Sequence, residues 1–237
     1  MPIFEIKILQ KLSKLRLSLF LKAYKLPRII KKMPENKPER KKFRIMAAGD
    51  IHGDAKLAEK LAKKAHEEKV DLVILTGDIT GMMETKNLIK PFIDRKEKVV
   101  FVPGNWDSPD TAEVLSKLYG IKNLEDYHVA YDNLGIFGLG SAGQLFLDEK
   151  ETFSKLKKSF DRVKNLEKKI MVSHIHAAGT KSELSGFPGS TSLRRAIEKF
   201  QPDLFIAGHI HELEGVEETI GKTKVINVGR KGRIIEI

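Results

Sequence analysis

The stretch FRIMAAGDIHGD, residues 43–54, contains the pattern that decides the fold. Its first half, Phe43–Ala48, is a short apolar run of the length and composition expected for a buried β-strand. A polar segment with carboxylates and a histidine follows at once, and the apolar positions of residues 54–69 then recur at helical spacing. A strand that leads through a polar turn into a helix is typical of an α/β domain.

The rest of the chain repeats this alternation of short apolar runs and charged, helix-like stretches. Four further runs are predicted to be strands: Val70–Thr76, Lys98–Val102, Lys169–Ser173 and Asp203–Ala207. Two more predicted strands, residues 127–132 and 135–139, are close enough in sequence to pair directly. The C-terminal segments Val216–Ile220, Thr223–Val228 and Arg233–Ile237 have the pattern of antiparallel strands joined by glycine turns.

The charge of the chain is distributed unevenly. The 237 residues carry a formal net charge of +11, from 43 Lys and Arg against 32 Asp and Glu. Residues 1–43 hold 13 of the basic and 3 of the acidic side chains, so the remainder is nearly neutral. We therefore do not expect a long basic groove for nucleic acid over the body of the protein.

Several classes of site and location are excluded by what the sequence lacks. Cysteine is absent, so any metal must be held by nitrogen and oxygen ligands, and disulfides and thiol nucleophiles are excluded. No stretch reaches the roughly 18–20 apolar residues of a membrane span, and the first ten residues lack a secretory pattern. We expect a cytoplasmic protein, and the basic N-terminal segment leaves open a peripheral position at the inner membrane face.

The N-terminal segment is predicted to be a separate unit. Residues 1–32 form a basic amphipathic helical arm, residues 33–42 a polar linker with prolines, and residues 43–237 the main domain. The arm has three interpretations: binding to an anionic membrane surface, packing on a helical partner, or binding nucleic acid. The last is the least favoured, because few aromatic residues are interleaved with the basic ones.

Polar clusters stand at the C-terminal ends of the five apolar runs, where α/β sheets build their sites. The candidate ligands are Asp50, His52, Asp78, Asn105, His174, His209 and His211. A single Gly-Asp pair is more often a turn than a ligand, but all five runs end in a potential metal ligand. Mixed carboxylate and imidazole ligands suit Mn, Fe, Zn, Ni or Co, and two such ions can activate a shared hydroxide.

These motifs, in this order, resemble the calcineurin-like metallophosphoesterase superfamily from about Phe43 to the C-terminus. Within it, Gly208–Glu212 and Asn227–Gly229 are similar to predicted phosphoesterases related to cyclic-nucleotide phosphodiesterases. The resemblance implies a four-layer αββα sandwich of two mixed sheets flanked by helices, with the amphipathic helix in front. It also implies two divalent metal ions, with manganese expected first.

The same resemblance implies a role for each ligand. Asp50, His52 and His211 would hold one metal ion. Asn105, His174 and His209 would hold the other, and Asp78 would bridge the two. Asp78, Asn105 and His174 are accordingly the expected catalytic residues.

One position departs from the family pattern. Trp106 stands directly after Asn105, where the family often has a histidine that assists the phosphoryl group or the leaving group. Indole cannot transfer protons, so we expect either a preference for good leaving groups or another acid, such as His176. Asp107 is predicted either to orient neighbouring groups or to form a structural turn, and His176 either to line the site or to pack.

The expected function is hydrolysis of a phosphoester, a diester rather than a monoester, by attack of a metal-bridging hydroxide. Two alternatives remain open: a binding module that kept the fold without turnover, and a nuclease. The polar loop 179–191 comes after the predicted strand that leads to His174. It is expected either to border the site, where Phe187 would stack on a base or ring, or to be a solvated surface loop.

Overall fold

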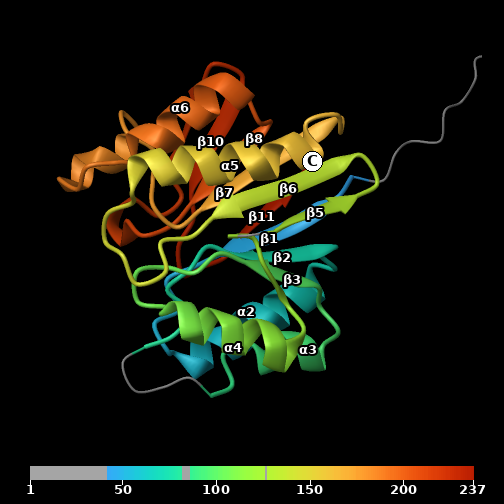
Figure 1. Ribbon diagram of the computed structural model, residues 1–237. Coiled ribbons are helices and arrows are strands. Elements are labelled where there is room, and N and C mark those ends of the chain that lie inside the picture. The colour runs from blue at the N-terminus through green and yellow to red at the C-terminus, as the bar shows by residue number, and fades with distance from the viewer. Residues whose placement is uncertain (1–41, 82–85, 126) are drawn as a thin grey trace, which may run out of the picture. The chain divides into compact units, whose positions relative to one another are not determined.

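The computed structural model describes residues 42–81, 86–125 and 127–237 (Figure 1). The predicted helical arm, residues 1–32, and the linker up to residue 41 lie outside the described residues, so the domain boundaries stay a prediction. None of the helices that the structure describes combines the length and the apolar character needed to cross a membrane.

The described residues form two mixed β-sheets. The first sheet has the strand order β11-β1-β2-β3-β4, and its members are β1 (Arg44–Ala48), β2 (Leu72–Leu75), β3 (Val99–Phe101), β4 (Lys122–Asn123) and β11 (Arg233–Glu236). The second has the order β5-β6-β7-β8-β10-β9, and its members are β5 (His128–Tyr131), β6 (Leu134–Leu139), β7 (Lys168–Ser173), β8 (Leu204–Ala207), β9 (Glu217–Ile220) and β10 (Thr223–Asn227). The strands of both sheets are parallel except at the edges: β11 is antiparallel in the first sheet, and β5 and β9 are antiparallel in the second.

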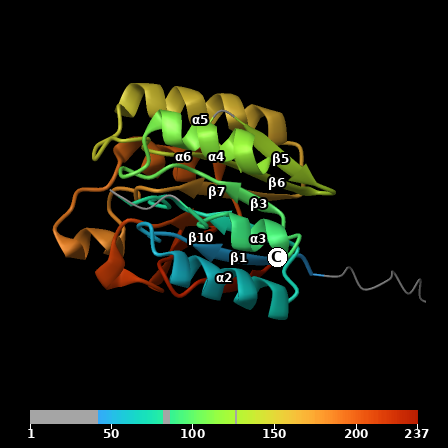
Figure 2. The ribbon, with the colours of Figure 1, turned by 90° about the horizontal axis from the view of Figure 1, so that it is seen from below.

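Helices cover the outer face of each sheet (Figures 1 and 2). The first sheet is covered by α2 (Ala55–Glu67), α3 (Lys90–Asp94) and α4 (Pro109–Tyr119). The second is covered by α5 (Glu149–Val163) and α6 (Thr191–Phe200). Two short 3₁₀ helices, η1 (Lys181–Ser185) and η2 (His211–Leu213), lie in the loops after β7 and β8. The layers therefore run helix, sheet, sheet, helix, as the resemblance implies.

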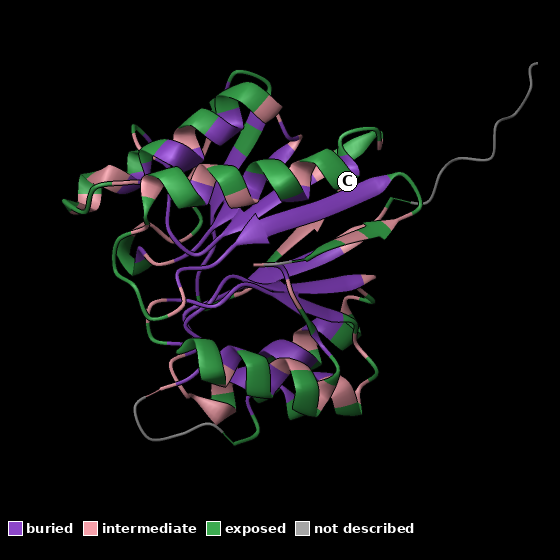
Figure 3. Cartoon of the chain, viewed as in Figure 1, coloured by how far each residue is buried: buried purple, intermediate pink, exposed green. Residues whose placement is uncertain are grey.

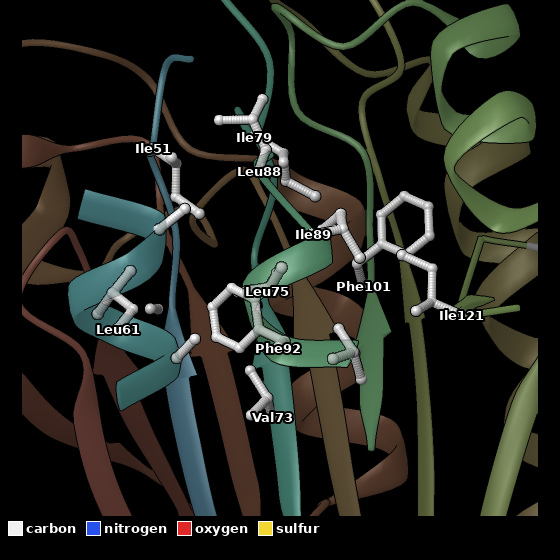
Figure 4. Packing of buried hydrophobic residues seen from close by; sticks show 14 of the residues in the cluster. Ile51, Leu61, Val73, Leu75, Ile79, Leu88, Ile89, Phe92, Phe101 and Ile121 are labelled. Carbon is white, nitrogen blue, oxygen red and sulfur yellow. The ribbon is translucent and has the colours of Figure 1, made fainter. Parts of the chain in front are cut away.

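Three apolar clusters hold the four layers together. One lies between the two sheets and joins residues such as Ile74 of β2 to Ile206 of β8. Another packs α2, α3 and α4 on the first sheet, with Phe92 and Phe101 at its centre (Figure 4). The third packs α5 and α6 on the second sheet. Because the central strands are buried on both faces (Figure 3), they read as continuous apolar runs rather than as alternating ones.

The predicted strands are all present, but the last one pairs differently from the simplest expectation. β9 and β10 are antiparallel neighbours in the second sheet. β11 does not continue that meander; it crosses to the first sheet and pairs antiparallel with β1, with Arg44 opposite Glu236. Gly232, at φ +69°, stands directly before β11, where a side chain would collide with Leu61 of α2. Strand β11 thus forms one edge of the first sheet, and the segment before it connects the two sheets.

Candidate metal centre

The seven predicted ligands all follow the carboxyl ends of parallel strands. In the first sheet, β1 leads to Asp50 and His52, β2 to Asp78 and β3 to Asn105. In the second sheet, β7 leads to His174 and β8 leads to His209 and His211. Parallel strands direct their carboxyl ends to the same edge of a sheet, and the distances below show that the two edges meet.

The loops that hold these residues are cross-linked through their backbones. The Asp50 N–H donates to the Gly77 carbonyl over 2.9 Å, and the His52 N–H donates to the Asp78 carbonyl over 2.8 Å. Asp50, His52, Asp78 and His209 all have positive φ, between 49° and 72°. Left-handed backbone at a non-glycine residue costs about 1–3 kcal/mol and is concentrated at functional sites. The fold therefore bears this cost at four of the seven ligand positions.

Two groups of three side chains place potential ligand atoms together. Asp50, His52 and His211 form the first group, in which every ligand atom lies within 4.8 Å of the others. The His52 and His211 Nε2 atoms are 3.3 Å apart, and His211 Nε2 is 3.2 Å from Asp50 Oδ1. Two imidazole nitrogens this close to a carboxylate oxygen are suited to hold one divalent cation.

The second group consists of Asp78, His174 and His209, again within 4.8 Å of one another. Asn105 belongs beside it, because its Oδ1 is 2.9 Å from His174 Nε2. Asp78 lies between the two groups: its Oδ2 is 3.4 Å from His174 Nε2 and 3.7 Å from His52 Nε2. A single carboxylate oxygen facing both groups is in the position of a bridging ligand.

The chemistry of these atoms fits divalent cations. His174 donates its Nδ1–H to the Thr76 carbonyl over 2.8 Å, and its Nε2 faces the acceptor Asn105 Oδ1 over 2.9 Å and Asp78 Oδ2 over 3.4 Å. Burial would lower the pKa of His174, but the hydrogen bond and charge of Asp78 raise it, which favours a proton on Nε2 when no metal ion is bound. Two facing acceptors are stable only with a cation or a proton between them. Asp50 Oδ1 is likewise buried, and no group in the described part of the protein donates a hydrogen bond to it. Such orphaned acceptors are what a metal ion would satisfy.

The pKa shifts of the side chains in this site show how tightly these groups are coupled. Burial lowers the pKa of His209 to about 4, and the neighbouring His174 adds to the shift. Burial also lowers the pKa of His52 and raises the pKa of Asp50. For Asp78, burial alone would raise the pKa, but the hydrogen bond and charge of His174 outweigh it, so the pKa is lowered. Asp78 is therefore a carboxylate, and His209 a neutral imidazole, over the physiological range.

Asp107 has a positioning role. Its carboxylate is 1% exposed and accepts hydrogen bonds from the Gly104 N–H, the Ile79 N–H and both the N–H and the hydroxyl of Thr80, over 2.7–3.1 Å. The first donor belongs to the loop of Asn105, and the others belong to the loop of Asp78. Asp107 thus fixes the loop of Asn105 to the loop of Asp78.

Trp106 and His176 have different places at the site. The backbone N–H of Trp106 donates to Asp78 Oδ1 over 2.8 Å. The indole ring of Trp106 lies against the His52 ring, with centroids 5.4 Å apart. His176 is buried and donates its Nε2–H to the Phe187 carbonyl over 3.2 Å. Neither of its ring nitrogens is in the two ligand groups. His176 therefore supports the wall of the site instead of lining its centre.

Sequence reasoning did not single out two residues that belong to the site. The Thr76 carbonyl fixes the tautomer of His174, and a backbone carbonyl leaves no signal in the residue type. Arg230 ion-pairs with Asp54 over 2.9 Å, and its charge contributes, after burial, to the lowered pKa of His52. Arg230 follows the Asn227–Gly229 motif by one residue, but one basic residue among 43 carries no distinguishing pattern.

The structure resembles solved structures of distant sequence. A Thermus thermophilus protein, TT1561, superimposes with a TM-score of 0.65 at 17% identity, covering 83% of this chain and 99% of that one. A dimetal phosphatase from Danio rerio gives a TM-score of 0.59 at 14% identity, with 79% and 88% covered. The yellow lupin (Lupinus luteus) purple acid phosphatase PPD1 gives 0.55 at 14% identity, with 81% and 44% covered. At these identities the likeness shows the fold alone.

Sequence comparison gives the family. No curated protein matches the chain. The model of the calcineurin-like phosphoesterases matches residues 43–213, which contain every one of the seven candidate ligands. The family implies a metal-dependent hydrolase of phosphoric esters. With the two-sheet fold and two groups of potential metal ligands at one edge of it, the chain belongs to the calcineurin-like phosphoesterase family.

Proposed function

We propose that this protein is a phosphodiesterase with a binuclear metal centre. The observation that carries the proposal is the position of Asp78 Oδ2, within 3.4 Å of His174 Nε2 and 3.7 Å of His52 Nε2. One carboxylate oxygen that faces both ligand groups is suited to two ions bound side by side.

The seven side chains divide between two ions in this proposal. Asp50, His52 and His211 hold one, and Asn105, His174 and His209 hold the other, with Asp78 shared. The ligand set is compatible with manganese, iron, zinc, nickel and cobalt, and manganese is proposed first because of the family resemblance. When bound, the two ions supply positive charge to the phosphoryl oxygens and make a nucleophile available from water near neutral pH.

The chain's own groups orient this centre. The backbone N–H of Trp106 donates to Asp78 Oδ1, which leaves Asp78 Oδ2 to face both ligand groups. The Thr76 carbonyl holds the proton of His174 on Nδ1, which keeps Nε2 available as a ligand. Fixing the atoms before substrate binds avoids the cost of reorganisation during reaction.

A diester substrate is supported by the surroundings of the two groups. An exposed aromatic ring lies beside each of them, Trp106 against His52 and Phe187 against His209. A phosphodiester carries an organic substituent on two of its oxygens, whereas a monoester carries one. Two flanking apolar surfaces match the diester better.

The side chain after Asn105 supports a further part of the proposal. Trp106 offers no proton to a departing oxygen, and general acid catalysis is typically worth about 10²–10⁴-fold. We therefore propose that the enzyme acts best on esters with good leaving groups. Rates that do not vary with the pKa of the leaving group would contradict this.

A metal-resolved substrate screen tests the function. The substrates are bis-p-nitrophenyl phosphate, p-nitrophenyl phosphate, cyclic nucleotides, nucleotide diphosphate diesters and single-stranded DNA, each with Mn²⁺, Fe²⁺, Zn²⁺, Ni²⁺ or Co²⁺. We expect diester hydrolysis that needs a metal and is lost in Asp78→Ala. Equal inactivity of both proteins with every metal would favour a binding module. Cleavage of single-stranded DNA above all other substrates would favour a nuclease.

For the N-terminal arm, the sequence supports a second and separate proposal. We propose that residues 1–32 bind an anionic membrane surface, which would place the enzyme at the cytoplasmic face of the inner membrane. The remaining chain has its own three apolar cores, so a chain of residues 43–237 is a suitable comparison. Cosedimentation with anionic vesicles is expected for the full chain only, and equal binding by both chains would exclude this role for the arm.

A further inference from the structure

Two aromatic side chains flank the metal centre, one beside each ligand group. The Trp106 ring centroid is 5.4 Å from that of His52, with an interplanar angle of 84°. The Phe187 ring centroid is 5.8 Å from that of His209, with an angle of 77°. A perpendicular contact occupies at most one face of each ring, and the two side chains remain 50% and 46% exposed. Each ring therefore keeps a face that another group can cover.

Both rings are presented on an anchored backbone. The Trp106 N–H is held by Asp78 Oδ1 over 2.8 Å. The Phe187 carbonyl accepts from the buried His176 ring over 3.2 Å, and its N–H donates to the Ser185 hydroxyl over 3.3 Å. His176 itself is held in place because its carbonyl accepts from the Ser190 N–H over 2.9 Å. The loop around Phe187 is thus fixed to the segment after β7, which carries His174 and His176.

The chemistry of the two rings favours a planar aromatic partner. Their exposed faces adjoin a centre that would bind an anionic phosphate, so an occupant must be attached to that phosphate. Stacking of a base on an aromatic side chain is worth about 1–3 kcal/mol and tolerates any base, because every base has a π-face. An alkyl group gains contact area with such rings but no stacking.

We propose that Trp106 and Phe187 are specificity-determining residues that bind an aromatic ring, a nucleobase or an aryl group, carried by the phosphodiester substrate. The inference rests on the proposed function, because it names the substrate class of the same centre. It predicts that the enzyme selects nucleotide-type and aryl esters over alkyl esters.

Kinetics with a constant leaving group test the selection. The substrates are thymidine 5′-(p-nitrophenyl phosphate), phenyl p-nitrophenyl phosphate and ethyl p-nitrophenyl phosphate. Because the leaving group is the same, its effects cancel in the ratio of kcat/KM for a ring-bearing ester to kcat/KM for the ethyl ester. The truncation, Phe187→Ala or Trp106→Ala, that removes the ring beside the non-leaving group is expected to lower this ratio by roughly 5- to 150-fold, the equivalent of one lost stack. The other truncation removes the ring beside the p-nitrophenyl group, which all three esters share, and is expected to lower kcat/KM for all three. A thymidine ratio that falls while the phenyl ratio does not would assign the site to nucleobases.

Two control variants separate ring recognition from general damage. Phe187→Tyr keeps a ring and is expected to keep the preference. Leu118→Ala removes an apolar side chain that is more exposed than either ring, near the far end of α4, and is expected to change nothing. A ratio that is unchanged in both Phe187→Ala and Trp106→Ala would overturn the inference.

A binding measurement separates this inference from the proposed function. Trp106 is the only tryptophan of the chain, so its fluorescence reports a ligand stacked on it. With Mn²⁺ present, thymidine 5′-monophosphate is expected to quench the Trp106 fluorescence saturably, whereas ethyl phosphate is not. Phe187→Ala is expected to weaken the binding of the nucleotide. Ring-specific quenching without hydrolysis of any ester would support the aromatic site and refute the function. Metal-dependent hydrolysis, with equal fluorescence quenching by both ligands, would support the function and refute the aromatic site.

Discussion

Replacing Asp107 by asparagine tests the claim that this side chain holds the metal centre together. The carboxylate accepts four buried hydrogen bonds from three residues, Gly104, Ile79 and Thr80. An asparagine of nearly the same shape supplies only one acceptor oxygen. The amide nitrogen of the asparagine is a donor and cannot accept a hydrogen bond. It must face either the Ile79 and Gly104 N–H groups or the Thr80 N–H, and these donors then lose their acceptor.

The expected loss of stability follows from these contacts. A hydrogen bond to a charged group contributes about 1.5–3 kcal/mol, so losing two would cost about 3–6 kcal/mol. Rotation of the Thr80 hydroxyl recovers part of this, because it can donate elsewhere. We expect Asp107→Asn to lower the free energy of unfolding by about 3 kcal/mol, a large share of the roughly 5–15 kcal/mol of a typical domain.

Guanidinium chloride unfolding in the presence of EDTA measures this effect without a contribution from bound metal. Asp110→Asn is the matched control, because Asp110 is exposed in the first turn of α4 and such changes usually stay within about 0.5 kcal/mol. A loss below about 1 kcal/mol for Asp107→Asn would refute the reasoning. The same variant is expected to bind Mn²⁺ more weakly by roughly 10–100-fold, as is typical for groups behind metal ligands.

Three further changes have defined outcomes. Gly104→Ala would place a Cβ in collision with Asp78 Oδ1, so Mn²⁺ affinity by calorimetry should fall at least about tenfold, whereas Gly120→Ala, whose Cβ meets nothing within 4 Å, should leave it unchanged. The pKa of His209 is lowered to about 4, so the unfolded chain binds more protons than the folded one between pH 4 and about 6.5. The stability measured without metal therefore falls as the pH falls through that window. A pH series of unfolding midpoints should show a smaller decline for His209→Gln than for the unchanged protein, and an equal decline would contradict this. Trp106→His supplies a proton donor, so kcat should rise most for esters with poor leaving groups, and a uniform change across a leaving-group series would show that position 106 does not handle the proton.

The α/β class and the candidate ligands could be predicted from local signals in the sequence, whereas the four-layer architecture followed only from the family resemblance. Buried parallel strands read as apolar runs, and each run is followed by a residue with a metal-ligating side chain. The pairing of β11 with β1 could not be predicted, since nothing in residues 233–236 specifies which edge they extend. That choice is made by the packing of two sheets, which is a property of the whole domain.

The roles of the supporting residues also required the structure. Asp107 in the sequence is one carboxylate after Trp106, and only the position of the Asp78 loop shows that it joins two ligand-bearing segments. His176 is two residues beyond His174, a spacing that favours a place in the site. In a strand end this spacing returns to the same face only while the extended geometry lasts, and the structure directs the His176 ring to the carbonyl of Phe187.

Equilibrium dialysis against Mn²⁺, with hydrolysis of bis-p-nitrophenyl phosphate followed on the same samples, tests the central claim most directly. We predict that the protein binds two Mn²⁺ ions per chain and that hydrolysis appears as the second ion binds. Asp78→Ala is predicted to bind fewer ions and to lose hydrolysis, because Asp78 Oδ2 faces both ligand groups. Saturation at one ion or none, or an Asp78→Ala protein that binds two ions and stays active, would contradict a shared binuclear centre.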